Sequence, residues 1–220
     1  MADADLNEPR RFVVLDGGEG CGKSTQIRLL EAAYAGANLR PLVVRDPGTT
    51  RVGELIRAIL LNPDHTEMSM RCEMLLYMAA RAQMAAETIG PTLAAGRALL
   101  CDRFVSSTLS YQLGGDGLTA DEITDTLAVA LGGCPHPDVT VILDMPVERS
   151  IARVGPKRDR IEQRPIAYHE QVRQNYLDQA ARDPARYAVV DADRPVRDVH
   201  ADILAACRLH DAPLFEEVGA

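Results

Sequence analysis

The chain has 220 residues, of which 46% are hydrophobic and 25% are charged, and its formal net charge is −8. This length and composition are typical of one globular α/β domain with a sizeable core. The sequence contains no apolar run long enough to span a bilayer, and the negative charge opposes general attraction to nucleic acid, so we expect neither a membrane nor a nucleic-acid partner.

Five short apolar runs predict β-strands, and each of them ends in a charged residue: Phe12 to Asp16, Pro41 to Arg45, Ala98 to Asp102, Val139 to Asp144 and Ala188 to Asp191. The segments between them have helical periodicity: Lys23 to Gly36, Val52 to Leu61, Ser69 to Leu93, Thr119 to Leu131, Val147 to Arg153, Ile166 to Arg182 and Val196 to Leu209. Strands that alternate with helices predict a five-stranded parallel sheet with helices on both faces. In such sheets ligands bind at the carboxyl ends of the strands.

The ends of the chain and its cysteines complete the organisation. Residues 1–9 are acidic and polar, unlike a signal or transit peptide, and we expect a disordered leader there, followed by one domain over residues 10–210 and a tail over 211–220. The five cysteines occur singly, with no C-x-x-C pair. This spacing argues against a zinc site or a disulfide framework and favours a cytoplasmic location.

The turn after the first strand carries the clearest motif, because residues 17–24 fit the pattern G-x-x-x-x-G-K-S/T of a phosphate-binding loop. Lys23 is then expected to reach the β- and γ-phosphates of ATP, and the Ser24 hydroxyl to bind Mg²⁺. The alternative is a glycine-rich turn without a ligand. The expected ATP-binding residues are Gly17, Gly18, Glu19, Gly20, Cys21, Gly22, Lys23, Ser24 and Thr25.

Two further pairs of residues suggest chemistry. Asp102 ends the third strand and could help to hold Mg²⁺, and Arg103 beside it could stabilise phosphate charge; the alternative is a capping Asp with a surface Arg. Tyr77 and Arg81 are four residues apart and share one helix face, so together they could stack on a flat ring and bond to its edge. That spacing alone favours a core Tyr beside a surface Arg.

A basic segment with glycine and proline follows the fourth strand, and we predict a mobile lid over about residues 153–163. A charge run is usually a solvated face, but a closing lid that carries arginines suits phosphoryl transfer between two anions. The cations of the lid and of the short helix that leads into it are Arg149, Arg153, Lys157, Arg158 and Arg160.

Taken together, these motifs resemble the thymidylate kinase family of P-loop nucleoside monophosphate kinases, from about Phe12 to Leu209. The matching stretches are residues 15–25, 45–48, Tyr77 with Arg81, 100–104, 107–112 and 159–163. The resemblance implies a P-loop NTPase fold with a short basic lid. It also implies transfer of the γ-phosphoryl of ATP to dTMP, giving dTDP and ADP on the way to dTTP, with Mg²⁺, in a homodimer.

The resemblance also implies roles at the acceptor. Glu19 contacts the sugar 3′-hydroxyl and the Mg²⁺ region, Arg103 with Arg57 binds the acceptor phosphate, and Tyr111 crowds C2′ and disfavours ribose. For the base, the implied contacts are stacking by Tyr77, donation to a thymine carbonyl by Arg81, and reading of the base by Thr108 and Gln112.

The phosphate loop has Gly20 and Cys21 where some family members carry a catalytic arginine. The chain therefore resembles the group that supplies this arginine from the lid, and we expect Arg153 first and Arg158 second, beside the catalytic Lys23 and Arg103. Two other functions stay open. One is a different nucleoside monophosphate or deoxynucleoside kinase on the same scaffold, and the other is a nucleotide-dependent switch that is not a kinase.

Overall fold

The computed structural model describes residues 11–156 and 158–209, so the predicted leader, the predicted tail and Lys157 lie outside the described residues. Within them, one all-parallel sheet has the strand order β2-β3-β1-β4-β5. Its strands are β1 (Phe12–Gly17), β2 (Leu42–Arg45), β3 (Leu99–Asp102), β4 (Val139–Asp144) and β5 (Tyr187–Asp191). The predicted five-stranded parallel sheet is confirmed.

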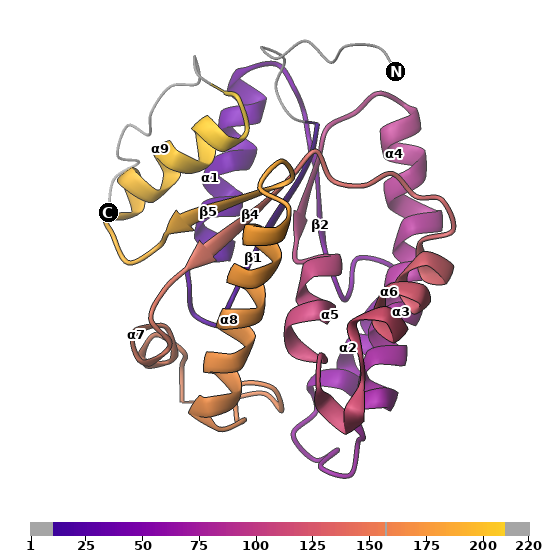
Figure 1. Cartoon of the computed structure of the whole chain (residues 1–220). Helices are drawn as coiled ribbons and strands as arrows, with labels where there is room; N and C mark the ends of the chain where they lie inside the picture. Colours follow the sequence, from indigo (N-terminus) through magenta and orange to yellow (C-terminus); the bar gives the residue numbers. More distant parts are fainter. Residues whose placement is uncertain (1–10, 157, 210–220) are drawn as a thin grey trace.

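Helices cover both faces of this sheet (Figure 1). They are α1 (Lys23–Gly36), α2 (Arg51–Leu61), α3 (Met70–Met84), α4 (Gly90–Ala94), α5 (Val105–Tyr111), α6 (Ala120–Leu131), α7 (Val147–Ala152), α8 (Ile166–Arg182) and α9 (Val196–Ala206). Successive β1 side chains point to opposite faces. Val13 and Leu15 pack in the cluster that includes α1 and α9, whereas Phe12 and Val14 pack in the cluster that includes α3.

The predicted helix over Ser69–Leu93 is divided in the structure. A π-helical turn over Ala85–Ile89 separates α3 from α4, and the amide of Gly90 donates to the carbonyl of Ala85. Pro91 lacks the N–H that would bond the Glu87 carbonyl in a regular helix, which accounts for the wider turn. The last helix also ends earlier than predicted, at Ala206.

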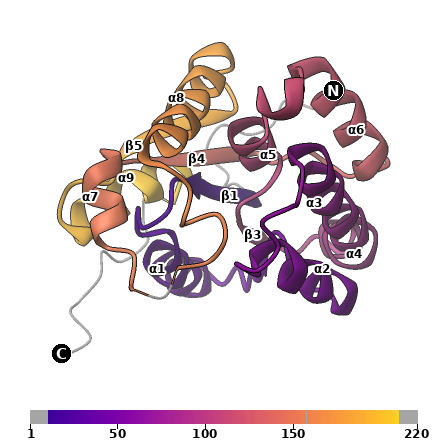
Figure 2. The ribbon, with the colours of Figure 1, turned by 90° about the horizontal axis from the view of Figure 1, so that it is seen from below.

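The carboxyl ends of the strands meet at one edge of the sheet. Asp102 is in register with Leu15 of β1 and with Arg45 of β2. At the end of β1, Gly17 has φ +136°, and a Cβ on it would lie 2.6 Å from the Leu143 carbonyl oxygen, so only glycine fits where β1 passes β4. Figure 2 shows the turn before α1, helix α7 and the segment between α7 and α8 gathered together.

None of the helices in residues 11–156 and 158–209 is long and apolar enough to cross a membrane.

Candidate active site

The phosphate loop connects β1 to α1, and the start of that helix has no side-chain cap. Gly22 is the N-cap, with φ 99°. The Lys23 ammonium donates to the carbonyls of Gly17 (3.1 Å) and Gly18 (2.6 Å), so it lies along the loop. Free N–H groups at a helix start, with a cation beside them, form a site for phosphate.

Helix α7 packs directly on this loop at Gly20. A Cβ on Gly20 would lie 2.0 Å from the Ser150 carbonyl oxygen, and the residue has φ +71°. The loop therefore has no room for a side chain at this position. Arg153 is the C-cap of α7 and so stands close to the loop on the helix that contacts it.

A hollow at the ends of β2 and β3 contains the two residues predicted to bind the metal. Ser24 and Asp102 both line it, and the buried Oδ1 of Asp102 has no hydrogen-bond partner among the described residues. A carboxylate with an unpartnered oxygen and a hydroxyl-bearing residue that line the same hollow fit Mg²⁺, which prefers oxygen ligands and keeps several waters. The described residues contain no cluster of three or more His, Cys, Asp or Glu that would hold a metal without such waters or phosphates.

A second pocket lies beside the loop and collects every residue that the sequence predicts for the acceptor. These are Glu19, Arg57, Tyr77, Arg81, Arg103, Thr108, Tyr111 and Gln112. They come from the phosphate loop, α2, α3, the end of β3 and α5. Asp46, Leu61 and the lid residues Asp159 and Ile161 also line the pocket and were not predicted to do so. We call this the acceptor pocket.

Arg103 links the acceptor pocket to the phosphate loop. Its backbone is left-handed (φ 66°), and its guanidinium donates to the Gly17 carbonyl (2.8 Å) and to Glu19 (2.7 Å). The Tyr111 hydroxyl also donates to Glu19 (2.8 Å). Burial alone would raise the pKa of Glu19, but the Arg103 guanidinium and the Lys23 ammonium outweigh it and lower that pKa to about 2. Glu19 is therefore ionised throughout the neutral range.

Asp16 supports this arrangement, although the sequence indicated it only as the charged end of a strand. Its buried carboxylate accepts from the hydroxyls of Ser106 (2.6 Å), Ser107 (2.8 Å) and Tyr176 (2.6 Å), and lies 3.4 Å from the Arg103 guanidinium. It thereby ties α5 and α8 to the end of β1.

Arg81 is buried, contrary to the surface position that its spacing from Tyr77 favours. Its side chain is 1% exposed, and its Nε donates to Asp46 at 2.6 Å. The guanidinium also donates to the Thr108 hydroxyl (2.9 Å) and to the Phe104 carbonyl (3.2 Å). Tyr77 is the more exposed of the two. The pocket wall thus consists of a cation held rigidly by three elements and an aromatic ring beside it.

The cations of the lid differ in the hydrogen bonds and ion pairs that they make with the rest of the protein. Arg149 and Arg153 both pair with Asp193, the latter at 3.9 Å with its side chain 49% exposed. Arg160 pairs with buried Glu73 and donates to the Leu60 carbonyl (2.8 Å), which leaves it committed to the fold. Arg158 is exposed, and its side chain makes no hydrogen bond or ion pair with a described residue. Among the described cations of this segment, Arg153 and Arg158 therefore have the weakest contacts with the rest of the structure.

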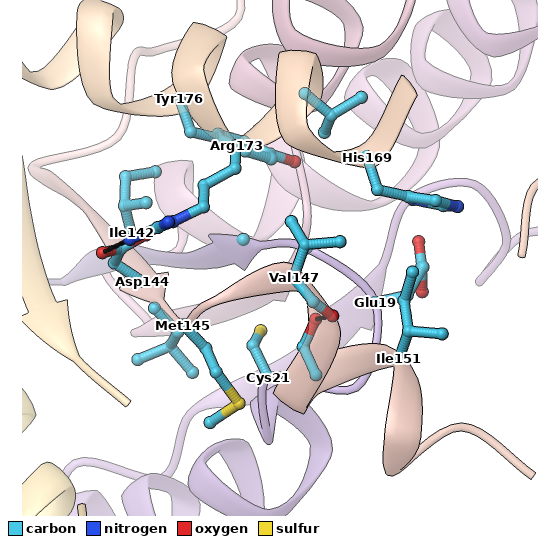
Figure 3. Close-up of a pocket in the computed structure, with 15 residues that line it drawn as sticks. Glu19, Cys21, Ile142, Asp144, Met145, Val147, Ile151, His169, Arg173 and Tyr176 are labelled. Carbon is cyan, nitrogen blue, oxygen red and sulfur yellow. Dashed lines mark hydrogen bonds and ion pairs between the residues drawn. The ribbon is translucent and has the colours of Figure 1, made fainter. Parts of the chain in front are cut away.

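A small cavity lies behind the phosphate loop, between the loop, α7 and α8 (Figure 3). Its volume of about 20 Å³ is room for one water molecule. Arg173 pairs with Asp144 on one side of it (2.7 Å), and buried His169, whose Nε2 has no partner among the described residues, lies on the other. Asp144, at the end of β4, lies outside the acceptor pocket, and its carboxylate forms the ion pair with Arg173.

Comparisons with known proteins show which family the chain belongs to. The family model described as Thymidylate kinase matches residues 15–203. A thymidylate kinase of Desulforudis audaxviator is 43% identical over 208 residues, which are 93% of this chain and 94% of that protein. One from Pseudomonas savastanoi is 43% identical over 194 residues, covering 87% of this chain and 92% of its own. The crystal structure of thymidylate kinase from Ehrlichia chaffeensis superposes with a TM-score of 0.71 at 25% identity, over 90% of this chain and 98% of that one. The P-loop fold class predicted from the sequence is thus confirmed, and the chain belongs to the thymidylate kinase family.

Proposed function

We infer that the chain is a thymidylate kinase, which transfers the γ-phosphoryl group of ATP to dTMP and releases dTDP and ADP. One observation carries this function from the geometry. The Gly17 carbonyl accepts hydrogen bonds from both Lys23, on the ATP side, and Arg103, on the acceptor side. The cations for the two phosphates therefore meet at one point, as in-line transfer between them requires.

The acceptor pocket suits a flat base with a carbonyl on its edge. A guanidinium has five N–H donors, and Arg81 uses four of them on Asp46, Thr108, Phe104 and the Met78 sulfur. One N–H is left for a base carbonyl, while the Tyr77 ring can stack on the base face. Thymine offers such a carbonyl where cytosine has an amino group, so this contact favours dTMP over dCMP.

For the sugar and the phosphate, we propose that Glu19 accepts from the 3′-hydroxyl and that Arg57 and Arg103 bind the phosphate. Tyr111 is held by Glu19 and lies under the Arg103 guanidinium, 5.1 Å from ring centroid to Cζ. A ring fixed in this way would crowd a 2′-hydroxyl and disfavour ribonucleotides.

The chemistry needs no general base, because the attacking oxygen of dTMP already carries negative charge. Lys23 and Arg103 would neutralise the charge that two close phosphates bring together. Asp102 and Ser24 would hold Mg²⁺, which would supply positive charge to polarise the phosphate groups of ATP. Our candidates for the arginine that stabilises charge on the transferred phosphoryl group are Arg153 and Arg158. Arg153 caps the helix that contacts the loop, and the Arg158 side chain makes no hydrogen bond or ion pair with a described residue.

Two further parts of the proposal concern the oligomeric state of the enzyme and its location in the cell. Helix α2 has an exposed apolar stripe, in which Val52, Leu55 and Ile59 are 39%, 60% and 44% exposed, and this supports a homodimer formed through α2. A cytoplasmic location is supported by the five free cysteines.

The function is tested by a coupled assay of ADP release with dTMP, dUMP, dCMP, UMP and no acceptor. We expect dTMP to be the best acceptor, and dUMP to be weaker by the about 1–3 kcal/mol that a methyl group contributes. ADP release without an acceptor would instead indicate a hydrolytic switch, and preference for dCMP or UMP would indicate a different kinase.

A further inference from the structure

Glu73 is a buried carboxylate on α3 that connects the acceptor pocket to the lid. Its side chain is 0% exposed. One of its oxygens, Oε2, accepts from the lid residue Arg160 and from Arg164 (2.7 Å). The other, Oε1, accepts from the Gln112 side-chain amide (2.7 Å). No motif in the sequence singles this residue out.

The contact with Glu73 fixes which way the Gln112 amide points. An ionised carboxylate can only accept hydrogen bonds, so the amide must turn its NH₂ group to Glu73 and its carbonyl oxygen away. Two guanidinium groups, those of Arg160 and Arg164, pair with the other oxygen of this carboxylate. Gln112 lines the acceptor pocket, and its carbonyl oxygen accepts no hydrogen bond from any residue that the structure describes.

We propose that Glu73 is a positioning residue for base selectivity, because it makes Gln112 present an acceptor rather than a donor to the base. This deepens the proposed function and rests on it. Thymine and uracil carry N–H at N3 and can donate to the Gln112 carbonyl. Cytosine has a bare N3 and would leave two acceptors facing each other, which is costly in a buried pocket.

The substitution Glu73→Gln should reverse the Gln112 amide. The carbonyl of the new side chain would be taken by Arg160 and Arg164, so its NH₂ would face Gln112. Gln112 would then turn its own carbonyl to position 73 and its NH₂ to the base, which suits the bare N3 of cytosine. Base preference would change although position 73 does not line the acceptor pocket.

The experiment measures kcat/KM for dTMP, dCMP and dUMP with ATP, for the full chain and for Glu73→Gln. We expect the dTMP to dCMP ratio to fall at least about tenfold, equivalent to ~1.4 kcal/mol. The dTMP to dUMP ratio should not change, since both bases carry N3–H. An unchanged dTMP to dCMP ratio in the folded variant overturns the proposal. If the unaltered chain does not use dTMP, the proposed function itself fails, which is a distinct result.

Four further variants extend the test, and the first three of them do not require a stable Glu73→Gln protein. Glu73→Asp keeps the charge for both arginines but withdraws the carboxylate from Gln112, and it should also lower the dTMP to dCMP ratio. Arg164→Met removes a charged partner of Glu73 without touching Gln112 and should leave that ratio unchanged. Gln112→Leu should lower the ratio by itself, and adding Glu73→Gln to it should have no further effect on the ratio. A further fall in the double variant would show that Glu73 acts otherwise and would refute the proposal.

Discussion

Replacement of Arg81 by Met removes the guanidinium from a buried ion pair and tests how the wall of the acceptor pocket is built. Both side chains of the Arg81–Asp46 pair are 1% exposed, and their atoms approach to 2.6 Å. The Oδ1 of Asp46 already has no hydrogen-bond partner among the described residues. Without Arg81, its Oδ2 would lose its partner as well, and a charged carboxylate would be left alone in the interior.

Removal of one partner of a buried ion pair costs about 3–5 kcal/mol. The free energy of unfolding of a whole domain is only about 5–15 kcal/mol, so the variant should be markedly less stable. The loss should depend on pH. Burial already raises the pKa of Asp46 against the opposing effect of Arg81. In the variant this pKa rises further, and protonation relieves the buried charge. The stability deficit should therefore be largest near pH 8 and shrink as the pH falls toward 5.

Urea denaturation of the ligand-free protein at pH 8 and pH 5 measures this deficit. Arg71→Met is the matched control, because Arg71 lies on the same helix in an exposed ion pair with Glu122, and exposed pairs contribute little. Arg81→Met combined with Asp46→Asn leaves no charge behind and should remove the pH dependence. The reasoning is refuted if Arg81→Met is no less stable than Arg71→Met, or if its deficit is equal at the two pH values.

Three other predictions concern the phosphate loop and the lid. The pKa of Glu19 is lowered from 4.5 to about 2, so ionised Glu19 contributes at most about 3 kcal/mol to the free energy of unfolding. This contribution is present above pH 4.5 and is lost as the pH falls toward 2. Acid denaturation of Glu19→Gln should therefore lack this part of the pH dependence. Gly20→Ala should lower the thermal midpoint of unfolding, because the new Cβ would overlap the α7 backbone. Gly18→Ala should lower the midpoint less, because there is open space around Gly18. Equal midpoints for the two variants would show that α7 does not pack tightly on the loop. Arg153→Ala should reduce kcat by about 10²–10³ with little change in the KM for dTMP, and a loss seen only in Arg158→Ala would assign the transferring arginine to the lid tip.

The local order of the chain was readable before any contact was known. The apolar runs, the glycine pattern from Gly17 to Ser24 and the alternation of strands with helices all depend on neighbours in sequence. They sufficed to predict the five-stranded parallel sheet and the loop at its edge. Proximity in sequence also explains the errors, since periodicity extends the helix over Ser69–Leu93 without registering the missing N–H of Pro91.

Contacts between distant segments were decided only by the tertiary structure. Spacing placed Arg81 beside Tyr77. It could not show that the Arg81 guanidinium is buried in an ion pair with Asp46, which is 35 residues away. Asp16 and Glu73 were not predicted as site residues, because a buried carboxylate is defined by the donors that surround it, and these donors come from other elements. Periodicity records which face of an element is apolar; which charges meet across the sheet edge depends on how the elements pack, and packing is a property of the whole fold.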